Sequence, residues 1–251
     1  MLKLKVIACD VMNREVSYIA SQSRCYVDVT FLHQGLHNTP DKLREMVQQE
    51  IDKANGEFPY NYYNTCPTYD YIILGYGLCS NGIIGLKSSK VPLVVPRAHD
   101  CITLFLGSKE AYTDNFKNNP GTYWFPSGWI ERAWQPSELK YQVLLDDYTK
   151  RYGEDNAEFL MEMEQGWLKE YKNAGFIYWS TTPNIDYFRQ FTKDSAAFLN
   201  WNYVEFEGNA SLLSNMLNGI FNDNEVLIVP PTEEIAPSYD ESIICLNGKD
   251  V

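Results

Sequence analysis

About the first 115 residues alternate short apolar segments with segments of helical periodicity, and this alternation constrains the fold more than any other feature of the sequence. The segments that favour β-strands are Lys3–Ala8, Tyr26–Leu32, Tyr71–Leu74 and Val91–Val95. The last two are apolar throughout, which is typical of parallel strands whose two faces are both covered by helices. The sequence therefore predicts a doubly wound, Rossmann-like α/β lobe.

One helix between these strands has a clear start. Thr39 and Pro40 suit the N-cap and the first helical position. Leu43, Val47 and Ile51 then recur at every fourth residue, which is the spacing of one helix face. A strand, a loop and an amphipathic helix thus follow one another in this part of the chain.

The pattern breaks at residues 118–134, which are rich in proline, glycine and aromatic residues, and we expect a loop there. Helices are expected next at Ser137–Arg151 and Glu154–Lys172, separated at Gly153. Strand and helix alternation then resumes, with strands at Phe176–Trp179, Tyr203–Phe206 and Glu225–Val229.

These patterns predict an α/β protein with two Rossmann-like doubly wound lobes, mostly parallel sheets, and a helical, aromatic-rich crossover. The expected N-terminal lobe spans residues 1–118, and the expected C-terminal lobe spans 119–251 with a helical insertion at 137–173. The many Trp and Tyr residues suit either a ligand cleft or a subunit interface, so an oligomer is an open expectation.

Charge and hydropathy exclude several classes of function. The formal net charge is -12, so the chain lacks the positive surface with which proteins bind nucleic acid. The apolar run before Asp10 is too short for a signal peptide. The longest uncharged stretch, Tyr71–Leu86, contains four glycines and does not resemble a membrane span. We expect a cytoplasmic protein that binds neither nucleic acid nor membrane.

The cysteines do not form a disulfide pattern. Six cysteines in a chain of this size, without a CxxC pair, indicate thiols, metal ligands or core residues. Cys25, Cys66 and Cys245 lie away from the predicted strand ends, and we expect them to pack in the core.

The other cysteines and all three histidines follow predicted strands. In an open α/β sheet, ligands bind at the edge formed by the carboxyl ends of the strands. Thiolate and imidazole are the preferred ligands of zinc, and thiolates also hold iron–sulfur clusters. We therefore predict a metal site, with zinc favoured and an iron–sulfur cluster as the alternative. Its expected ligands are Cys9, Cys79, His99 and Cys101.

Further residues are expected around this site. Asp100 suits the N-cap of the next helix and a hydrogen bond to the imidazole, and Arg97 adds positive charge. A helix N-terminus beside Cys79 would lower the pKa of its thiol. Two glycines, Gly75 and Gly77, allow backbone amides to hold a carboxylate or phosphate.

The histidines of the second strand end have alternative roles. His33 and His37 are expected to join the metal site, to cap the following helix or to bind an anionic substrate. We expect the aromatic loop that contains Tyr123 and Trp129 to close over the site and exclude water. A phosphate-binding P-loop is excluded because Ile83 follows Gly82 where that motif needs lysine.

Three elements, LGYGLCSNG, VPRAHDCITLFLGS and GTYWFPSGW, carry a resemblance that covers nearly the whole chain. They resemble a domain-of-unknown-function family of methanogenic archaea and strictly anaerobic bacteria, often encoded beside corrinoid-dependent methyltransferases. The resemblance implies a role in anaerobic one-carbon or corrinoid metabolism.

A second similarity concerns the zinc methyltransferases that move a methyl group from a corrinoid to a thiol. His99 and Cys101 match their His-x-Cys pair, but Cys79 precedes this pair, whereas the third ligand of those enzymes follows it. Their barrel fold also differs from the fold predicted here. No Asp-x-His-x-x-Gly motif occurs, so the chain does not resemble the corrinoid carrier itself.

The expected function is that of a metal-binding protein of anaerobic one-carbon metabolism. It would be a zinc-dependent methyltransferase that acts on a metal-activated thiol, or a methyltransferase-associated protein with an accessory step. Its expected partners are a small-molecule substrate and a corrinoid protein. The alternatives are a non-catalytic module that binds a small ligand, and an iron–sulfur redox partner of a corrinoid protein.

Overall fold

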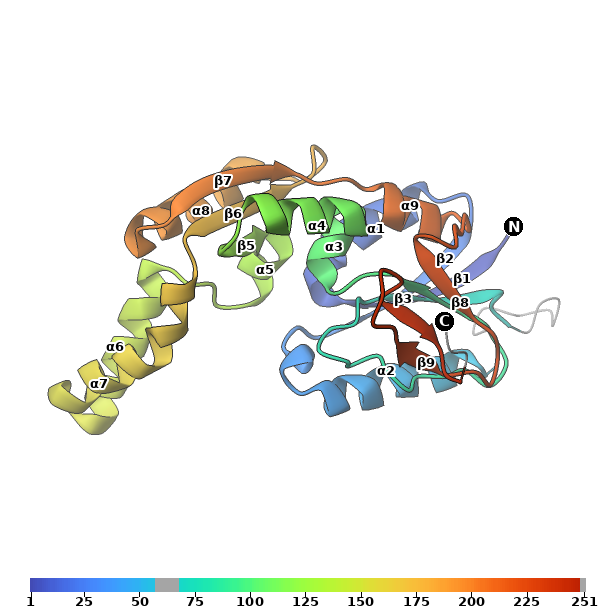
Figure 1. The fold of residues 1–251 in the computed structure, drawn as a ribbon, viewed down its shortest axis with the longest axis horizontal. Coiled ribbons are helices and arrows are strands. Elements are labelled where there is room, and N and C mark those ends of the chain that lie inside the picture. The colour runs from blue at the N-terminus through green and yellow to red at the C-terminus, as the bar shows by residue number, and fades with distance from the viewer. Residues whose placement is uncertain (57–67, 249–251) are drawn as a thin grey trace. The chain divides into compact units, whose positions relative to one another are not determined.

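The computed structural model describes residues 1–56 and 68–248, so Cys66 lies outside the described part. The chain forms two compact units (Figure 1). The first contains Met1–Tyr112 together with Asn209–Val251, and the second contains Thr113–Gly208. The expected C-terminal lobe included everything after residue 118. In the structure, residues 209–251 instead belong to the first unit.

The first unit contains a five-stranded sheet with the strand order β2-β1-β3-β4-β8. The pairs among β1, β2, β3 and β4 are parallel, whereas β8 runs antiparallel to β4. The α/β architecture expected from the sequence is confirmed. The strands are β1 (Lys3–Cys9), β2 (Tyr26–Leu32), β3 (Tyr71–Gly75), β4 (Leu93–Pro96) and β8 (Val226–Val229).

Helices cover this sheet on both faces (Figure 1). Leu43, Val47 and Ile51 of α2 are buried against alternate residues of the strands, as their spacing of four residues predicts. Helix α1 packs against α9. The helices are α1 (Asn13–Gln22), α2 (Pro40–Ala54), α3 (Cys101–Leu106) and α9 (Ser211–Leu217), with 3-10 turns η1 (Asp10–Met12) and η2 (Leu36–Asn38).

A small antiparallel pair completes the first unit. Its strands are β9 (Ile235–Pro237) and β10 (Ile244–Leu246). The guanidinium of Arg97 donates hydrogen bonds to the carbonyl oxygens of Ser242 at 2.9 Å and Ile244 at 2.7 Å. The pair is therefore attached to the segment that follows β4.

The second unit contains a parallel sheet with the order β5-β6-β7. The expected loop at residues 118–134 is wrong, because strand β5 and helix α5 form there. The run Thr-Tyr-Trp-Phe has high β-propensity, but glycine and proline on either side of it are typical of loops, so the strand is hard to recognise from the sequence. The strands are β5 (Thr122–Pro126), β6 (Asn173–Tyr178) and β7 (Asn202–Glu207).

The expected helical insertion forms a hairpin of α6 and α7, as in Figure 1. Ser137 accepts a hydrogen bond from the amide of Lys140 and so caps α6, and Gly153 separates the two helices. The helices of this part are α4 (Lys109–Asn118), which begins in the first unit, α5 (Ser127–Arg132), α6 (Glu138–Tyr152), α7 (Glu154–Gln165), η3 (Gly166–Glu170) and α8 (Ile185–Leu199).

An aromatic cluster forms part of the second unit's interior. The ring of Tyr123 lies 5.2–6.1 Å, between centroids, from the rings of Phe125, Trp129, Trp167, Tyr171 and Trp201. The Tyr123 hydroxyl donates to Gln135 at 3.1 Å. Tyr123 and Trp129 thus belong to a strand and a helix packed within this unit, and not to the expected closing loop. Within residues 1–56 and 68–248, no helix is long and apolar enough to cross a membrane.

Candidate thiol site at the sheet edge

Two cysteines meet at the carboxyl ends of β1 and β3. Cys9 is the last residue of β1, and Cys79 lies in the loop after β3. Both pack against the same apolar core, which also contains α2. Ala8 is paired with Gly75, where a side-chain Cβ would lie 2.6 Å from the Cβ of Ala8. The strand ends approach closely because position 75 has no side chain.

The loop after β3 is held against the segment between β4 and α3. The amide of Leu78 donates to the carbonyl of Ala98 at 2.8 Å, and the amide of Cys79 donates to the carbonyl of His99 at 2.9 Å. A Cβ at Gly77 would lie 2.6 Å from the amide nitrogen of Asp100. A third strand end is thereby brought to the same edge, as the sequence predicts.

The turn at Cys79 has an uncommon backbone conformation. Cys79, Ser80 and Asn81 have φ values of 46°, 57° and 66°, so three successive residues other than glycine occupy the left-handed region. Such residues cost about 1–3 kcal/mol each and tend to occur at functional sites. Arg44 supports the turn by donating to the carbonyl of Asn81 at 3.0 Å. The turn fixes the backbone at Cys79.

Both thiols are neutral at physiological pH. Burial raises the pKa of Cys9 to about 11, and the neighbouring Asp10 charge raises it further. Burial also raises the pKa of Cys79 to about 12, with contributions from the charges of Asp100 and Cys9. The expectation of a lowered pKa for Cys79 is therefore wrong. Burial and the carboxylate of Asp100 raise this pKa, whereas a helix N-terminus was expected to lower it.

Tyr76 adds a buried hydroxyl to this group. Its side chain is 4% exposed, and its hydroxyl has no hydrogen-bond partner within the described structure. Burial raises the pKa of Tyr76, and the charges of Cys9, Cys79 and Asp10 raise it further, which places the phenol among these groups. Because buried polar groups are normally hydrogen-bonded, this hydroxyl indicates a position for a bound group.

Gln34 supplies a second buried polar atom nearby. Its backbone amide donates to Asp10 at 2.8 Å, which ties the segment after β2 to the end of β1. Its side-chain oxygen is buried and has no partner among residues 1–56 and 68–248. Sequence reasoning missed both Tyr76 and Gln34. Only the apolar strands that precede them would have drawn attention to their positions.

Asp100 has the N-cap role that the sequence predicts. Its carboxylate accepts hydrogen bonds from the amides of Ile102 at 3.0 Å and Thr103 at 3.4 Å. Its other oxygen accepts a bond from the Tyr112 hydroxyl at 3.3 Å. Burial raises the pKa of Asp100, although these hydrogen bonds and the nearby His99 act in the opposite direction. Tyr112 is a further site residue that sequence reasoning missed.

The other expected ligands lie beside this group. The ring of His99 is exposed and lies 5.9 Å, between centroids, from the ring of Tyr112. Cys101 is the first residue of α3 and is partly buried. The pKa of Tyr112 is raised by burial, then by Asp100, and least by Cys101. In the described part of the chain, no three His, Cys, Asp or Glu side chains are arranged to hold a metal ion. The structure thus brings Cys9 and Cys79 together, with His99 and Cys101 on the adjoining segment.

The remaining predicted residues have other surroundings. His33 and His37 are exposed on the segment after β2, and the His33 ring donates through Nδ1 to the carbonyl of Gln34. Arg97 donates to backbone carbonyls of the C-terminal segment, including that of Asp223 at 2.8 Å. Its observed contacts are therefore structural.

A polar groove of about 750 Å³ lies along α2, away from the predicted site residues. Its side chains largely pair with one another: Gln48 binds the backbone of Lys87, and Lys87 binds Glu234 at 2.8 Å. The groove therefore presents few free groups to a ligand. It is lined by Asp41, Arg44, Glu45, Gln48, Asp52, Gly85, Lys87, Ser88, Ser89 and Thr232.

Comparison with known proteins identifies the family of the chain. Neither a curated protein nor a solved structure matches the chain. The model of the family described as "Protein of unknown function (DUF1638)" matches residues 31–217. The matched region includes the loop with Cys79 and the segment from His99 to Cys101. Since the match covers most of the sequence, the chain belongs to the DUF1638 family.

Proposed function

We propose that the edge formed by the carboxyl ends of β1 and β3 binds a thiophilic metal ion, with zinc favoured, through Cys9 and Cys79. His99 and Cys101 would complete a four-ligand set of the kind that zinc prefers. The four residues come from the ends of β1, β3 and β4, three neighbouring strands of the sheet, and such strand ends are where ligands bind in open α/β sheets.

The observation that carries this proposal is the joint placement of two thiols and an unpartnered phenol. Cys9, Cys79 and Tyr76 come from two neighbouring strand ends, burial and then both thiols raise the pKa of the phenol, and the Tyr76 hydroxyl has no partner among the described residues. A thiolate sulfur, or a substrate atom held at the metal, would accept the hydrogen bond that this hydroxyl can donate.

Completing the ligand set would require His99 and Cys101 to approach the thiol pair, because in the described part of the chain no three such side chains are arranged to hold a metal ion. The backbone of the β4–α3 segment is already attached to the Cys79 loop by the bonds of Leu78 and Cys79. His99 and Cys101 would approach the thiol pair from this attached segment. Asp100, which lies between them, keeps its bonds to the α3 amides.

The proposed chemistry is methyl transfer to a thiol, or an accessory step in methyl-group metabolism. A substrate thiol would take the place of one of the four protein ligands, and the zinc ion would hold it as its thiolate, with the thiol proton released to solvent. The sulfur would form a bond to the methyl carbon while the cobalt–carbon bond of a methylated corrinoid partner breaks, and its electron pair stays on cobalt. The LGYGLCSNG and VPRAHDC elements, which resemble the family encoded beside corrinoid-dependent methyltransferases, support this assignment. We propose a cytoplasmic, anaerobic setting on the same basis.

Elemental analysis of anaerobically purified protein tests the proposal. We expect about one zinc ion per chain, and visible absorbance would instead identify the iron–sulfur cluster of the alternative redox function. Cys9→Ser and Cys79→Ser should lose the metal, whereas the control Cys25→Ser should keep it. Protein without stoichiometric metal, or Cys9→Ser and Cys79→Ser variants that retain it, would overturn the proposal.

A second candidate is a non-catalytic module that binds a small polar ligand without metal. The unpartnered atoms of both Tyr76 and Gln34 favour it, because a ligand with one acceptor and one donor would satisfy them. Under this function, Cys79→Ala would cost about 2–3 kcal/mol of stability at most, through loss of packing. Metal content would be zero in every variant.

A further inference from the structure

The hairpin of α6 and α7 exposes large apolar side chains. On α7 and the following η3, Phe159 is 63% exposed, Met163 is 68% exposed and Trp167 is 42% exposed. On α6, Leu139 is 66% exposed and Val143 is 43% exposed. These values far exceed those of core residues, and side chains of this size seldom gather on a free surface without a binding role.

Their spacing places four of them in short rows. Phe159 and Met163 are four residues apart on α7, as are Leu139 and Val143 on α6, so each pair lies on one side of its helix. Helix α6 buries none of its residues, and α7 buries only Ala157 and Met161. Met161 lies about 200° around α7 from Phe159. Helix α7 therefore has one apolar side within the hairpin and another that faces solvent.

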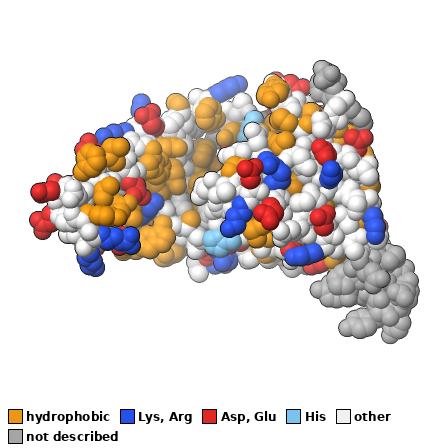
Figure 2. Space-filling view, turned by 90° about the horizontal axis from the view of Figure 1, so that it is seen from below, with side chains coloured by type: hydrophobic (Ala, Val, Ile, Leu, Met, Phe, Trp, Pro, Cys, Tyr) orange, Lys and Arg blue, Asp and Glu red, His pale blue; other side chains and the backbone are white. Residues whose placement is uncertain are grey.

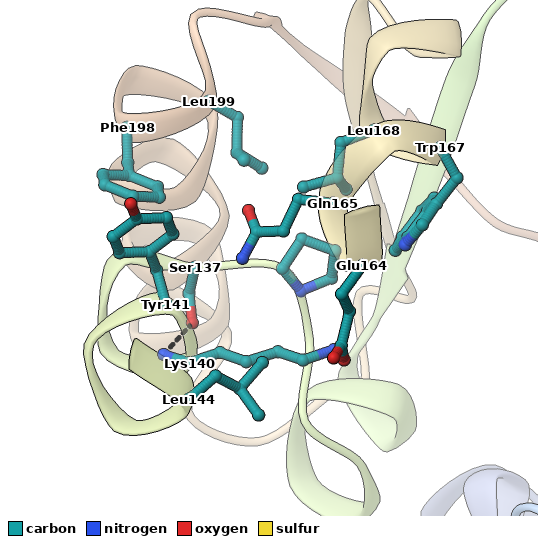
Figure 3. A pocket seen from close by; sticks show the side chains of 11 residues that line it. Ser137, Lys140, Tyr141, Leu144, Glu164, Gln165, Trp167, Leu168, Phe198 and Leu199 are labelled. Atoms are coloured by element: carbon teal, nitrogen blue, oxygen red, sulfur yellow. Dashed lines mark hydrogen bonds between the residues drawn. The ribbon is translucent and has the colours of Figure 1, made fainter. Parts of the chain in front are cut away.

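The hairpin is anchored and not loosely attached. Figure 3 shows Tyr141 of α6 beside Phe198 of α8, and their rings lie 5.7 Å apart. The hollow between these helices and η3 has a volume of only about 20 Å³. A space of this size holds one water molecule and no organic ligand. The exposed rows are thus presented by a packed support.

Acidic residues adjoin the apolar row on α7. Asp155, Glu158 and Glu162 lie within about 100° of Phe159 on one side of the helix. From Glu138 to Glu170 the chain has nine acidic and four basic residues. Figure 2 shows hydrophobic side chains gathered over the part of the molecule that carries α6 and α7, with acidic and basic side chains among them.

This charge decides between the kinds of partner. A second copy of the hairpin would bring like charges together across an apolar contact, which costs binding energy. An anionic membrane surface would be repelled for the same reason. We propose that the exposed side of α7 that carries Phe159 and Met163 is a docking surface for a partner protein that presents an amphipathic basic helix. The apolar row would supply affinity, and the flanking carboxylates would supply attraction and orientation.

A designed helical peptide of leucine and lysine, added to the full-length protein, tests the proposal. We expect binding measured by calorimetry to weaken as salt is added, and the corresponding leucine–glutamate peptide not to bind. Phe159→Ser with Met163→Ser should weaken binding about tenfold or more. Glu158→Gln with Glu162→Gln should weaken it less and reduce its dependence on salt.

The control is Tyr187→Ser on α8, because Tyr187 is as exposed as Phe159, at 63%. It should leave binding unchanged, and circular dichroism should show that every variant is folded. Equal binding of both peptides would overturn the proposal. So would equal binding by the Phe159/Met163 variant, or sedimentation showing that the wild-type protein self-associates through this face and that the double variant does not.

Discussion

At the scale of single residues, the Tyr76 hydroxyl is a group whose removal should separate stability from binding. It is buried without a partner in the described structure, and an unsatisfied group of this kind costs about 1–3 kcal/mol. We predict that Tyr76→Phe raises the free energy of unfolding of the metal-free protein by about 1 kcal/mol. Urea unfolding in the presence of a chelator measures this change.

The same variant should bind its metal or ligand more weakly, because the phenol would no longer donate to the bound group. Tyr239→Phe is the matched control, since Tyr239 is 99% exposed and should change neither property. A Tyr76→Phe protein that is less stable than the wild type would show that the hydroxyl already has a partner in the free protein.

The sequence locates some of these residues and not others. Cys9 and Cys79 follow apolar runs that can be recognised as strands, so their meeting at one edge is predictable. Tyr76 lies between Gly75 and Gly77, and its significance depends on the close contacts of those glycines with Ala8 and Asp100. Contacts of this kind join residues distant in sequence, and no local pattern encodes them.

At the scale of secondary-structure elements, the loop after β3 depends on the absence of a side chain at Gly77. A Cβ there would lie 2.6 Å from the amide nitrogen and 2.7 Å from the Cα of Asp100. We predict that Gly77→Ala lowers the free energy of unfolding by about 1–3 kcal/mol, because backbone must shift to remove the clash. It should also lower affinity for metal, since the β4–α3 segment would move away from Cys79.

Gly166 provides the control for this variant. It has φ of -53° and no neighbour within 4 Å of an added Cβ. Gly166→Ala should leave stability unchanged or raise it by about 0.4–1 kcal/mol, because alanine restricts the unfolded chain. Chemical denaturation of both variants provides the comparison, and equal stability of the two proteins would contradict the role of Gly77.

An ion pair that links α8 to β7 should give stability a defined pH dependence. Arg189 donates to Glu205 at 2.9 Å, and Tyr203 donates to the same oxygen at 2.6 Å. Burial raises the pKa of Glu205, but these hydrogen bonds outweigh burial, and the pKa is lowered. The stabilisation is therefore complete above the unfolded pKa of about 4.3 and is lost as pH falls through the folded value.

Arg189→Met should thus lower the free energy of unfolding only slightly at neutral pH, because the pair is partly exposed to solvent. The difference from the wild type should shrink between neutral pH and pH 3, because protonation of Glu205 removes its charge. Thermal unfolding at the two pH values measures this, and a difference that is equal at both would rule out the pair as its source.

At the scale of the whole molecule, local sequence patterns do not tell which sheet a strand joins. Val226–Val229 is recognisable as a strand, and its order in the chain suggests the C-terminal lobe. Instead it pairs antiparallel with β4, with Leu93 opposite Val229. Apolar runs report that a strand is buried, but they do not report which neighbour it joins. The two-sheet α/β architecture was therefore predictable, whereas the return of the chain to the first sheet was not.

That return leads to a prediction about independent folding. Cys9, Tyr76, Cys79 and Asp100 all belong to the first unit, which also contains residues 209–251. The chain re-enters the first unit at the end of α3, where the amide of Asn209 donates to the carbonyl of Phe105 at 3.1 Å. We predict that a protein with residues 113–208 replaced by a short glycine–serine linker folds cooperatively and binds metal as the full chain does.

A chain that ends at residue 208 is the matched comparison. It retains every proposed ligand but loses β8, and β4 becomes an exposed sheet edge with unpaired backbone groups. This chain should unfold or aggregate, whereas the linker variant should give a sharp thermal transition and the wild-type metal content. If the linker variant fails to fold while the truncated chain folds, the C-terminal strands are not what completes the first unit. Since the linker variant lacks α6 and α7, it should also fail to bind the leucine–lysine peptide, which places metal binding and docking in different units of the chain.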